Sequence, residues 1–254
     1  MSAATPEPAD PPTGQATDQA TDQATDQPTD QPTEQPAPVP VVEARHLGLV
    51  GPEGPVLTDV SLAVEAGRLT VVVGPGGSGR SSLLLAICGR MRGTTGTLLA
   101  QGRPVRTGRA LRALRGRTSV ARIATLVLPE ARLTVAQSVV ERALLDGVRP
   151  AAAEQAFAAA EDLLRTRLDR ATLTERLTVY EQSVLAVALA LVRTADLVVV
   201  DDVDADLDLD DQHRLLDALV RVAEHGPAVV ATTTEPSSVP ADAVLVTLAP
   251  PQEP

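Results

Sequence analysis

From residue 41 to residue 248 the chain alternates between short apolar runs and longer stretches with helical spacing. Two of the runs, residues 69–73 and 197–200, are apolar almost throughout, which is typical of strands buried on both faces. Turn-forming residues bound the others, as at Glu65-Ala66-Gly67. The further predicted strands are residues 41–44, 56–64, 97–100, 123–128, 228–232 and 243–248.

The segments between these strands carry apolar residues at the spacing of helices. Helices are predicted for residues 83–88, 135–145, 151–168, 181–192 and 210–222. In residues 103–122, arginines alternate with Leu111, Leu114 and Val120, which predicts a solvated helical arm. Strands that alternate with helices in this way predict an α/β fold with a mostly parallel sheet.

The first 39 residues have a different composition. Residues 17–36 repeat the unit T-D-Q-A and then T-D-Q-P, and they contain no large apolar side chain. Such a segment has no face to bury, so it is predicted to be a disordered acidic tail. We favour a solubilising role for it; the alternative is a docking segment for a partner.

Length and charge limit the classes of function. A chain of 254 residues suggests one domain, with or without a smaller subdomain. Its formal net charge of −11 includes seven acidic residues in the tail, which leaves about −4 for the rest. No basic face is evident, so a nucleic-acid binder is not expected. The single cysteine, Cys88, cannot form an internal disulfide and is predicted to pack as a small apolar side chain.

The beginning of the chain lacks the pattern of a signal peptide, and no apolar run approaches the roughly 20 residues of a membrane span. We therefore expect a cytoplasmic protein that reaches the inner face of the membrane only through a partner.

The stretch after the strand at 69–73 has the layout of a phosphate-binding loop, G-x-x-x-x-G-K-[ST], with arginine at the lysine position. Between a strand and a helix, such a loop presents backbone N–H groups and the positive end of the helix dipole to an anion. The candidate phosphate-binding residues are Gly74, Pro75, Gly76, Gly77, Ser78, Gly79, Arg80, Ser81 and Ser82.

All 22 basic residues of the chain are arginine, so a general bias against lysine explains Arg80 as readily as a functional change does. Its guanidinium keeps the positive charge but is larger than an ammonium group and planar. We therefore expect accurate placement of a γ-phosphate to suffer more than binding does.

Two acids follow the second buried run, about 120 positions after the loop. In phosphate-binding proteins the first such acid holds Mg²⁺ together with the loop hydroxyl, here Asp201 with Ser81. The second, Asp202, would orient or deprotonate an attacking water. The alternative is that both acids only end and solvate a buried strand.

From residue 41 to residue 248 the chain resembles the nucleotide-binding domain of ATP-binding cassette (ABC) transporters. The resemblance rests on the order and spacing of the loop, the segment Leu133-Thr134-Val135, the segment 177–191 and the acids at 201–208. It implies a P-loop NTPase fold over residues 40–254, with an antiparallel β region near its N-terminus. It also implies a small helical subdomain at about residues 129–195.

Several family motifs are altered. The signature L-S-G-G-Q becomes Leu177-Thr178-Val179-Tyr180-Glu181, whose bulk suits the first turn of a helix better than contact with a phosphate. No glutamine follows the strand predicted to end at Leu128, and Thr233-Thr234-Glu235 stands where the switch histidine is expected. An aromatic residue for adenine is missing near Leu49 and Val50. The three histidines, His46, His213 and His225, are predicted to lie on the surface.

The resemblance implies an ATP-binding transporter subunit that uses Mg²⁺ and works with a membrane-spanning subunit. Because each site in the family combines two chains, we expect a homodimer, or a heterodimer with a more complete ABC ATPase domain. Hydrolysis is expected to be weak or lost. The alternative is a non-hydrolysing regulatory or scaffolding protein on the same fold; a soluble P-loop kinase or GTPase is disfavoured, because no guanine-reading or acceptor-substrate motif is evident.

Overall fold

The computed structural model describes residues 39–123 and 126–249, all within one compact unit. The acidic repeat predicted for residues 1–39 lies outside the described residues, except for Val39. The elements follow the expected alternation of strands and helices, with two short 3₁₀ turns at Thr174–Arg176 and Pro236–Ser238.

A four-stranded antiparallel sheet occupies the N-terminal part, in the order β2-β1-β4-β5. Its strands are β1 (Val42–Gly51), β2 (Gly54–Val64), β4 (Thr94–Ala100) and β5 (Arg103–Pro104). Val42 pairs with Val64 on one side and with Ala100 on the other. The antiparallel region implied by the resemblance is confirmed, with β1 longer than the predicted residues 41–44.

The second sheet is parallel and has five strands in the order β6-β7-β8-β3-β9. They are β3 (Leu69–Val73), β6 (Thr118–Arg122), β7 (Leu197–Val200), β8 (Ala228–Thr233) and β9 (Val244–Thr247). All residues of β3, β7 and β8 are buried, as their continuous apolar runs predicted. The predicted α/β class with a mostly parallel sheet is confirmed.

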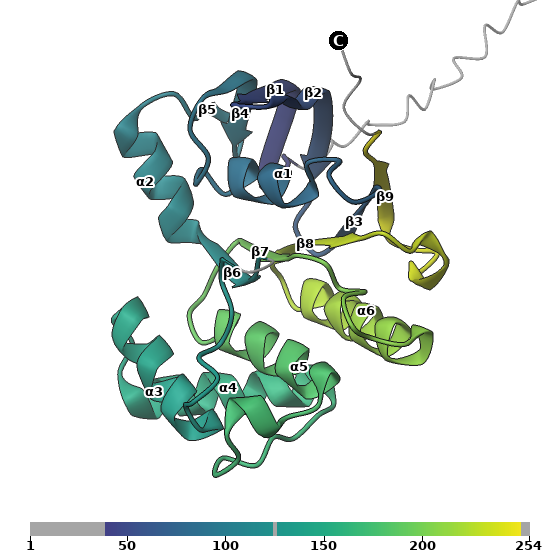
Figure 1. Ribbon diagram of the computed structural model, residues 1–254. Coiled ribbons are helices and arrows are strands. Elements are labelled where there is room, and N and C mark those ends of the chain that lie inside the picture. The colour runs from purple at the N-terminus through teal and green to yellow at the C-terminus, as the bar shows by residue number, and fades with distance from the viewer. Residues whose placement is uncertain (1–38, 124–125, 250–254) are drawn as a thin grey trace, which may run out of the picture. The chain divides into compact units, whose positions relative to one another are not determined.

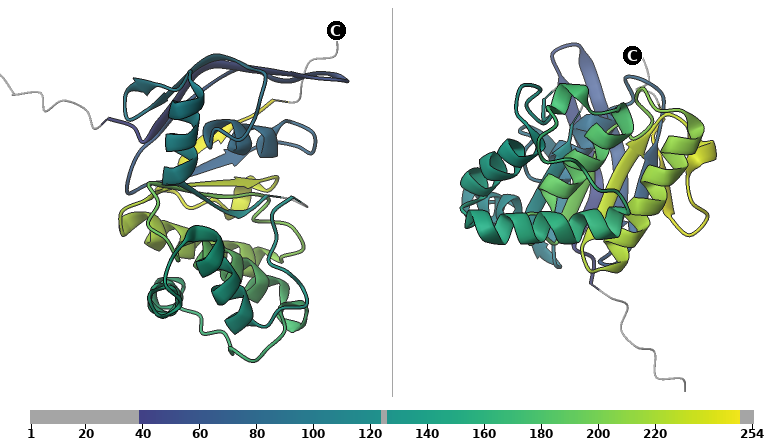
Figure 2. Two further views of the ribbon diagram at one scale, coloured as in Figure 1. Left: turned by 90° about the vertical axis from the view of Figure 1, so that its left-hand side faces the viewer. Right: turned by 90° about the horizontal axis from the view of Figure 1, so that it is seen from below.

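The layers stack in a simple order (Figure 1; Figure 2, left). Helix α1 (Arg80–Ile87) lies between the two sheets. The other face of the parallel sheet is covered by α5 (Val179–Ala190) and α6 (Leu209–Glu224). Helices α3 (Val135–Asp146) and α4 (Pro150–Leu164) pack on these two helices, farther from the sheet. Each face therefore has its own core: Leu83, Leu84 and Ile87 pack on one side, and Phe157, Leu185 and Leu216 on the other. The fully buried Cys88 belongs to the first core, as predicted.

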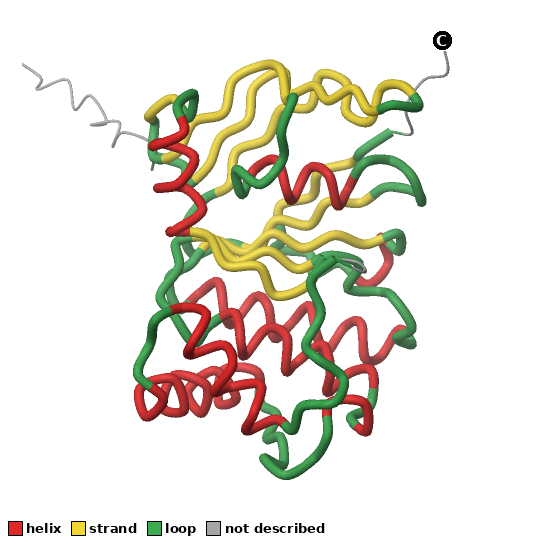
Figure 3. Tube along the Cα trace, turned by 60° about the vertical axis from the view of Figure 1, so that its left-hand side comes forward, coloured by secondary structure: helices red, strands yellow, loops and turns green. Residues whose placement is uncertain are grey.

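The prediction for residues 103–122 is wrong in part. Only Gly108–Arg117 is helical (α2); β5 precedes it, and β6 follows without an intervening loop. Figure 3 shows α2 running from the antiparallel sheet toward the parallel one. Strand β6 forms here because Thr118, Ser119 and Val120 are buried beside β7.

The strand predicted for residues 123–128 does not form in the part that the structure describes. An isolated bridge joins Ile123 to Val127, whereas Leu126 and Leu128 are exposed. The other helix predictions are confirmed to within a few residues. None of the helices within residues 39–123 and 126–249 has the length and apolarity needed to traverse a bilayer.

A buried carboxylate joins α4 to the segment that follows it. Glu161 is 1 % exposed, and its oxygens accept hydrogen bonds from Arg170 at 2.8 and 2.9 Å and from the Leu168 N–H at 2.8 Å. Burial alone would raise the pKa of Glu161, but these bonds outweigh it and hold the pKa below its usual value. The folded state thus favours the charged form.

Replacing Glu161 with alanine should lower the free energy of unfolding by about 3 kcal/mol, because it leaves Arg170 without its buried partner. Since its folded pKa is depressed, Glu161 contributes stability above its unfolded pKa and loses it as the pH falls. Urea unfolding at pH 7 and pH 4 measures both effects. Glu154→Ala is the matched control, because Glu154 also binds Arg170, at 2.8 Å, but is half-exposed; an equal loss in both variants would contradict the prediction.

Candidate functional site

The candidate phosphate loop connects the end of β3 to the start of α1. The Gly74 N–H donates to the Thr233 oxygen of β8 at 3.3 Å, which fixes the beginning of the loop. Gly79 has a φ of 88°, and a Cβ atom there would lie 2.5 Å from the Val56 oxygen. Only glycine fits this position, so close packing against β2 explains one glycine of the motif without reference to a ligand.

The loop nevertheless keeps unused hydrogen-bonding groups. Pro75, Gly76 and Gly77 are exposed, and across the described part of the chain no acceptor is found for the N–H groups of Gly76, Gly77 and Gly79. The hydroxyl of Ser78 is buried and has no partner there either. Unpaired donors at the N-terminus of a helix are the groups that bind an anion.

Arg80 does not extend into solvent. Its guanidinium donates to the Gly74 oxygen and lies 2.6 Å from Oδ1 of Asp202, with the Arg80 side chain 9 % exposed and that of Asp202 27 %. The predicted phosphate cation and the predicted catalytic carboxylate are therefore brought together, and they form an ion pair with each other. A phosphate group would have to compete with Asp202 for Arg80.

The neighbouring acid, Asp201, is completely buried at the end of β7. Its Oδ1 accepts a 2.5 Å hydrogen bond from the hydroxyl of Thr232, and its Oδ2 has no partner in the described residues. Thr232 in turn accepts a 2.8 Å hydrogen bond from the Asp202 N–H. Strand β8, which carries Thr232, lies between β7 and the loop strand β3.

Asp201 and Ser81 fit the requirements of a Mg²⁺ site in their chemistry. A buried carboxylate oxygen without a hydrogen bond is costly unless a cation or a water accompanies it. Ser81, in the first turn of α1, supplies a hydroxyl that makes no hydrogen bond within the described residues. The same residues contain no group of three or more His, Cys, Asp or Glu side chains that could hold a metal without help from a ligand.

Arg122 belongs to the site, although the sequence reasoning did not select it. Its guanidinium donates to the backbone oxygens of Asp201, at 3.2 Å, and of Asp202, and it reaches the Ser183 hydroxyl at 3.3 Å. Burial lowers the pKa of Arg122. The sequence signal for Arg122 is a charged residue at the end of a buried strand. It was missed because the strand was predicted at residues 123–128 and not at Thr118–Arg122.

The segment in place of the signature motif starts helix α5. Thr178 is its N-cap: the hydroxyl accepts from the Glu181 N–H at 3.2 Å, and the Glu181 carboxylate accepts from the Thr178 N–H at 2.9 Å. Tyr180 is buried, and Arg214 lies 4.2 Å from the centre of its ring. The segment therefore begins a helix, as predicted, and Thr178 and Glu181 are hydrogen-bonded to each other within the chain.

Three further expectations concern the missing adenine aromatic, the position of the switch histidine and the exposure of the histidines. Leu49 is buried and Val50 is 73 % exposed, so the end of β1 offers no aromatic surface to a base. After β8, Thr234 bonds to Asp204 through its N–H, at 2.9 Å, and through its hydroxyl. The three histidines are exposed, as predicted: His46, His213 and His225.

The Thr232 hydroxyl should be essential to the stability of this edge. Thr232→Val removes both a donor to Asp201 and an acceptor for Asp202, and it should lower the free energy of unfolding by about 2 kcal/mol. Thr70→Val is the matched control, because the buried hydroxyl of Thr70 has no partner. Chemical denaturation of both variants tests this; equal effects would refute the role given to Thr232.

Comparisons with known proteins identify the family and the fold of the chain. The family described as ABC transporter matches residues 57–205, which include the loop and both acids. The chain is 34 % identical over 205 residues to the hemin import ATP-binding protein HmuV of Myxococcus xanthus, covering 75 % of this chain and 73 % of that one. It is 27 % identical over 195 residues to the ribose import ATP-binding protein RbsA of Yersinia pestis, but spans only 38 % of the length of RbsA.

Among solved structures, cbiO1 of Clostridium perfringens, part of the ABC transporter complex cbiONQ, superimposes with a TM-score of 0.65. The match covers 77 % of this chain and 78 % of cbiO1 at 17 % identity, so it supports the fold alone. The family match extends over more than half of the chain, and the protein therefore belongs to the ABC transporter family.

Proposed function

We propose that this protein is the ATP-binding subunit of an ABC-type transporter, with hydrolysis weak or lost. The observation that carries the proposal is the set of unpaired N–H donors in the 74–82 loop, together with the buried Asp201 nearby. The loop follows β3 and Asp201 follows β7, and only β8 lies between these two strands. The phosphates of ATP would accept from the N–H groups of Gly76, Gly77 and Gly79 and from the first turn of α1.

Asp201 and Ser81 would hold Mg²⁺ beside the phosphates. The chemistry that Mg²⁺ would supply there is neutralisation of part of the phosphate charge. The chain's own contribution is the fixed position of the Asp201 carboxylate, which Thr232 holds by one oxygen while the other stays available.

Binding of ATP is proposed to displace Asp202 from Arg80. The Arg80–Asp202 pair is mostly buried, so the guanidinium cannot bind Asp202 and a phosphate equally well. The Asp202 carboxylate and the phosphate would also repel each other. Asp202 thus acts as an internal competitor of the γ-phosphate in the resting chain.

The Asp202→Asn variant should bind Mg-ATP about tenfold more tightly than the unaltered chain, because a charge-assisted bond no longer has to be broken. The φ of 45° at Asp202 suits asparagine, so the backbone should tolerate the change. Isothermal titration calorimetry measures the affinity. Asp206→Asn is the control, with the same loss of charge at an exposed residue whose φ is 58°; equal gains in both variants, or none, would oppose the competition.

Weak hydrolysis is expected for two reasons. Asp202 stands where the family has a glutamate and its side chain is one methylene shorter, and the Thr178 hydroxyl is engaged in capping α5. In the family each site combines the loop of one chain with the signature segment of another. A homodimer of this chain would therefore carry both defects at each of its two sites.

The purified chain should show no steady-state ATP hydrolysis above that of its Asp202→Ala variant, since Thr178 caps α5 and no intact signature segment is left to complete either site. A coupled assay of phosphate release, run on both proteins at saturating Mg-ATP, measures this. A turnover that the substitution abolishes would instead show Asp202 to be catalytic.

We further propose that the chain works at the cytoplasmic face of the membrane with a membrane-spanning subunit. Members of this family pair, and the damaged signature segment favours pairing with a more complete ABC ATPase domain over self-pairing. The similar protein cbiO1 is part of an ABC transporter complex, which supports this kind of assembly.

A second candidate function is a regulatory or scaffolding subunit that binds no nucleotide. The Arg80–Asp202 ion pair favours it, because the site satisfies its own charges without a ligand. The calorimetric titration separates the two candidates: saturable Mg-ATP binding by the unaltered chain supports the first, and no binding by the chain or by Asp202→Asn supports the second.

A further inference from the structure

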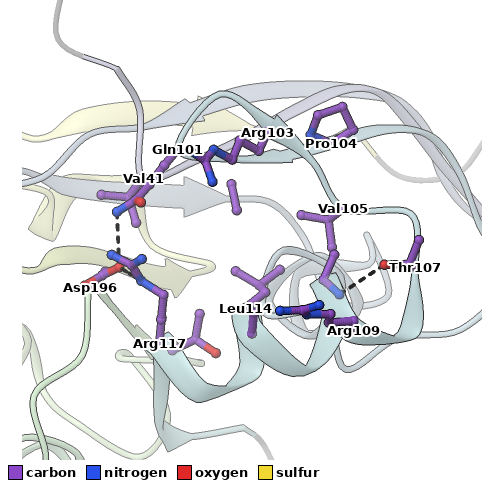
Figure 4. A pocket seen from close by; sticks show the side chains of 14 residues that line it. Val41, Gln101, Arg103, Pro104, Val105, Thr107, Arg109, Leu114, Arg117 and Asp196 are labelled. Carbon is purple, nitrogen blue, oxygen red and sulfur yellow. Dashed lines mark hydrogen bonds and ion pairs between the residues drawn. The ribbon is translucent and has the colours of Figure 1, made fainter.

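A cavity of about 350 Å³ lies between helix α2 and the antiparallel sheet, away from the loop and the two acids (Figure 4). One wall comes from α2, and the other from the end of β4 and the segment around β5. This volume equals about ten water molecules and falls within the usual range of small-ligand pockets.

The walls of this cavity are largely apolar. Its apolar lining includes Leu114 and Ala110 of α2 together with Val41, Ala100 and Val105. Leu114 is the one buried residue of α2. A short apolar body in the cavity would cover surface that the described residues leave exposed, which is favourable.

The charges around the cavity are positive. Arg103 and Arg109 line it, and within residues 39–123 and 126–249 neither of them makes an ion pair. The one lining carboxylate, Asp196, is bound by Arg117 and, at 3.4 Å, by Gln101. Residues 66–129 contain no acidic residue at all. A ligand would therefore meet two free guanidinium groups and one carboxylate that is already neutralised.

We propose that this cavity binds a small amphipathic anion, a carboxylate on a short apolar body of about eight carbons. The carboxylate would accept from the exposed guanidinium groups of Arg109 and Arg103, because guanidinium groups bind carboxylates in pairs of hydrogen bonds. The apolar body would lie against Leu114, Ala110 and Val105. This ligand is distinct from ATP, and the inference does not depend on the proposed function.

Calorimetric titration of the full chain with sodium octanoate, below its micelle concentration, tests the proposal. We expect saturable binding with one site per chain, about tenfold weaker binding of the uncharged octanol, and about tenfold weaker octanoate binding by Arg109→Gln. Arg112→Gln is the matched control, because Arg112 is an exposed residue of the same helix and does not line the cavity. It should bind octanoate as the unaltered chain does.

Two further variants keep the test decisive. Ala110→Leu fills the cavity without changing charge and should abolish binding, whereas Arg103→Gln repeats the charge test at a second position. Absence of saturable octanoate binding would overturn the proposal. So would equal weakening by Arg109→Gln and Arg112→Gln, since that would indicate diffuse attraction to a basic helix and no defined site.

Discussion

Two arginines and two aspartates share the carboxyl edge of the parallel sheet, and most of this edge is closed to water. Charges in such a place have to balance within a few ångströms, because water cannot screen them. Arg80 balances Asp202, while Arg122 binds the backbone oxygens of both acids and Thr232 binds the carboxylate of Asp201. The positions of the loop, of β7 and of β8 relative to one another depend on this set of contacts.

The sequence predicted the parts of the fold in which apolar runs coincide with burial. Leu69–Val73 and Leu197–Val200 lie in the middle of a sheet, so their composition and their environment agree. The same reasoning failed at residues 118–128. Thr118 and Ser119 are polar but buried in β6, whereas Leu126 and Leu128 are apolar but exposed. Here tertiary contacts, not local pattern, decide which residues form the strand.

The sequence predicted that the loop and the two acids lie close together, but it predicted neither their contacts nor the presence of Arg122 beside them. The glycine pattern and the two acids after a buried strand indicated which side chains come together, since both follow strands of one parallel sheet. The ion pair between Arg80 and Asp202 joins residues 122 positions apart and depends on side-chain conformation. Likewise, residues 177–181 were predicted as the first turn of a helix, but the capping box that Thr178 and Glu181 form there was not predicted.

The direct junction between α2 and β6 has a mechanical consequence. Helix α2 ends at Arg117 and β6 begins at Thr118, so no flexible linker separates them. Strand β6 is only five residues long and ends at Arg122, whose guanidinium holds the two aspartate carbonyls. Because no linker separates helix and strand, a shift of α2 along its axis would also move β6 and the Arg122 guanidinium that binds the two acids.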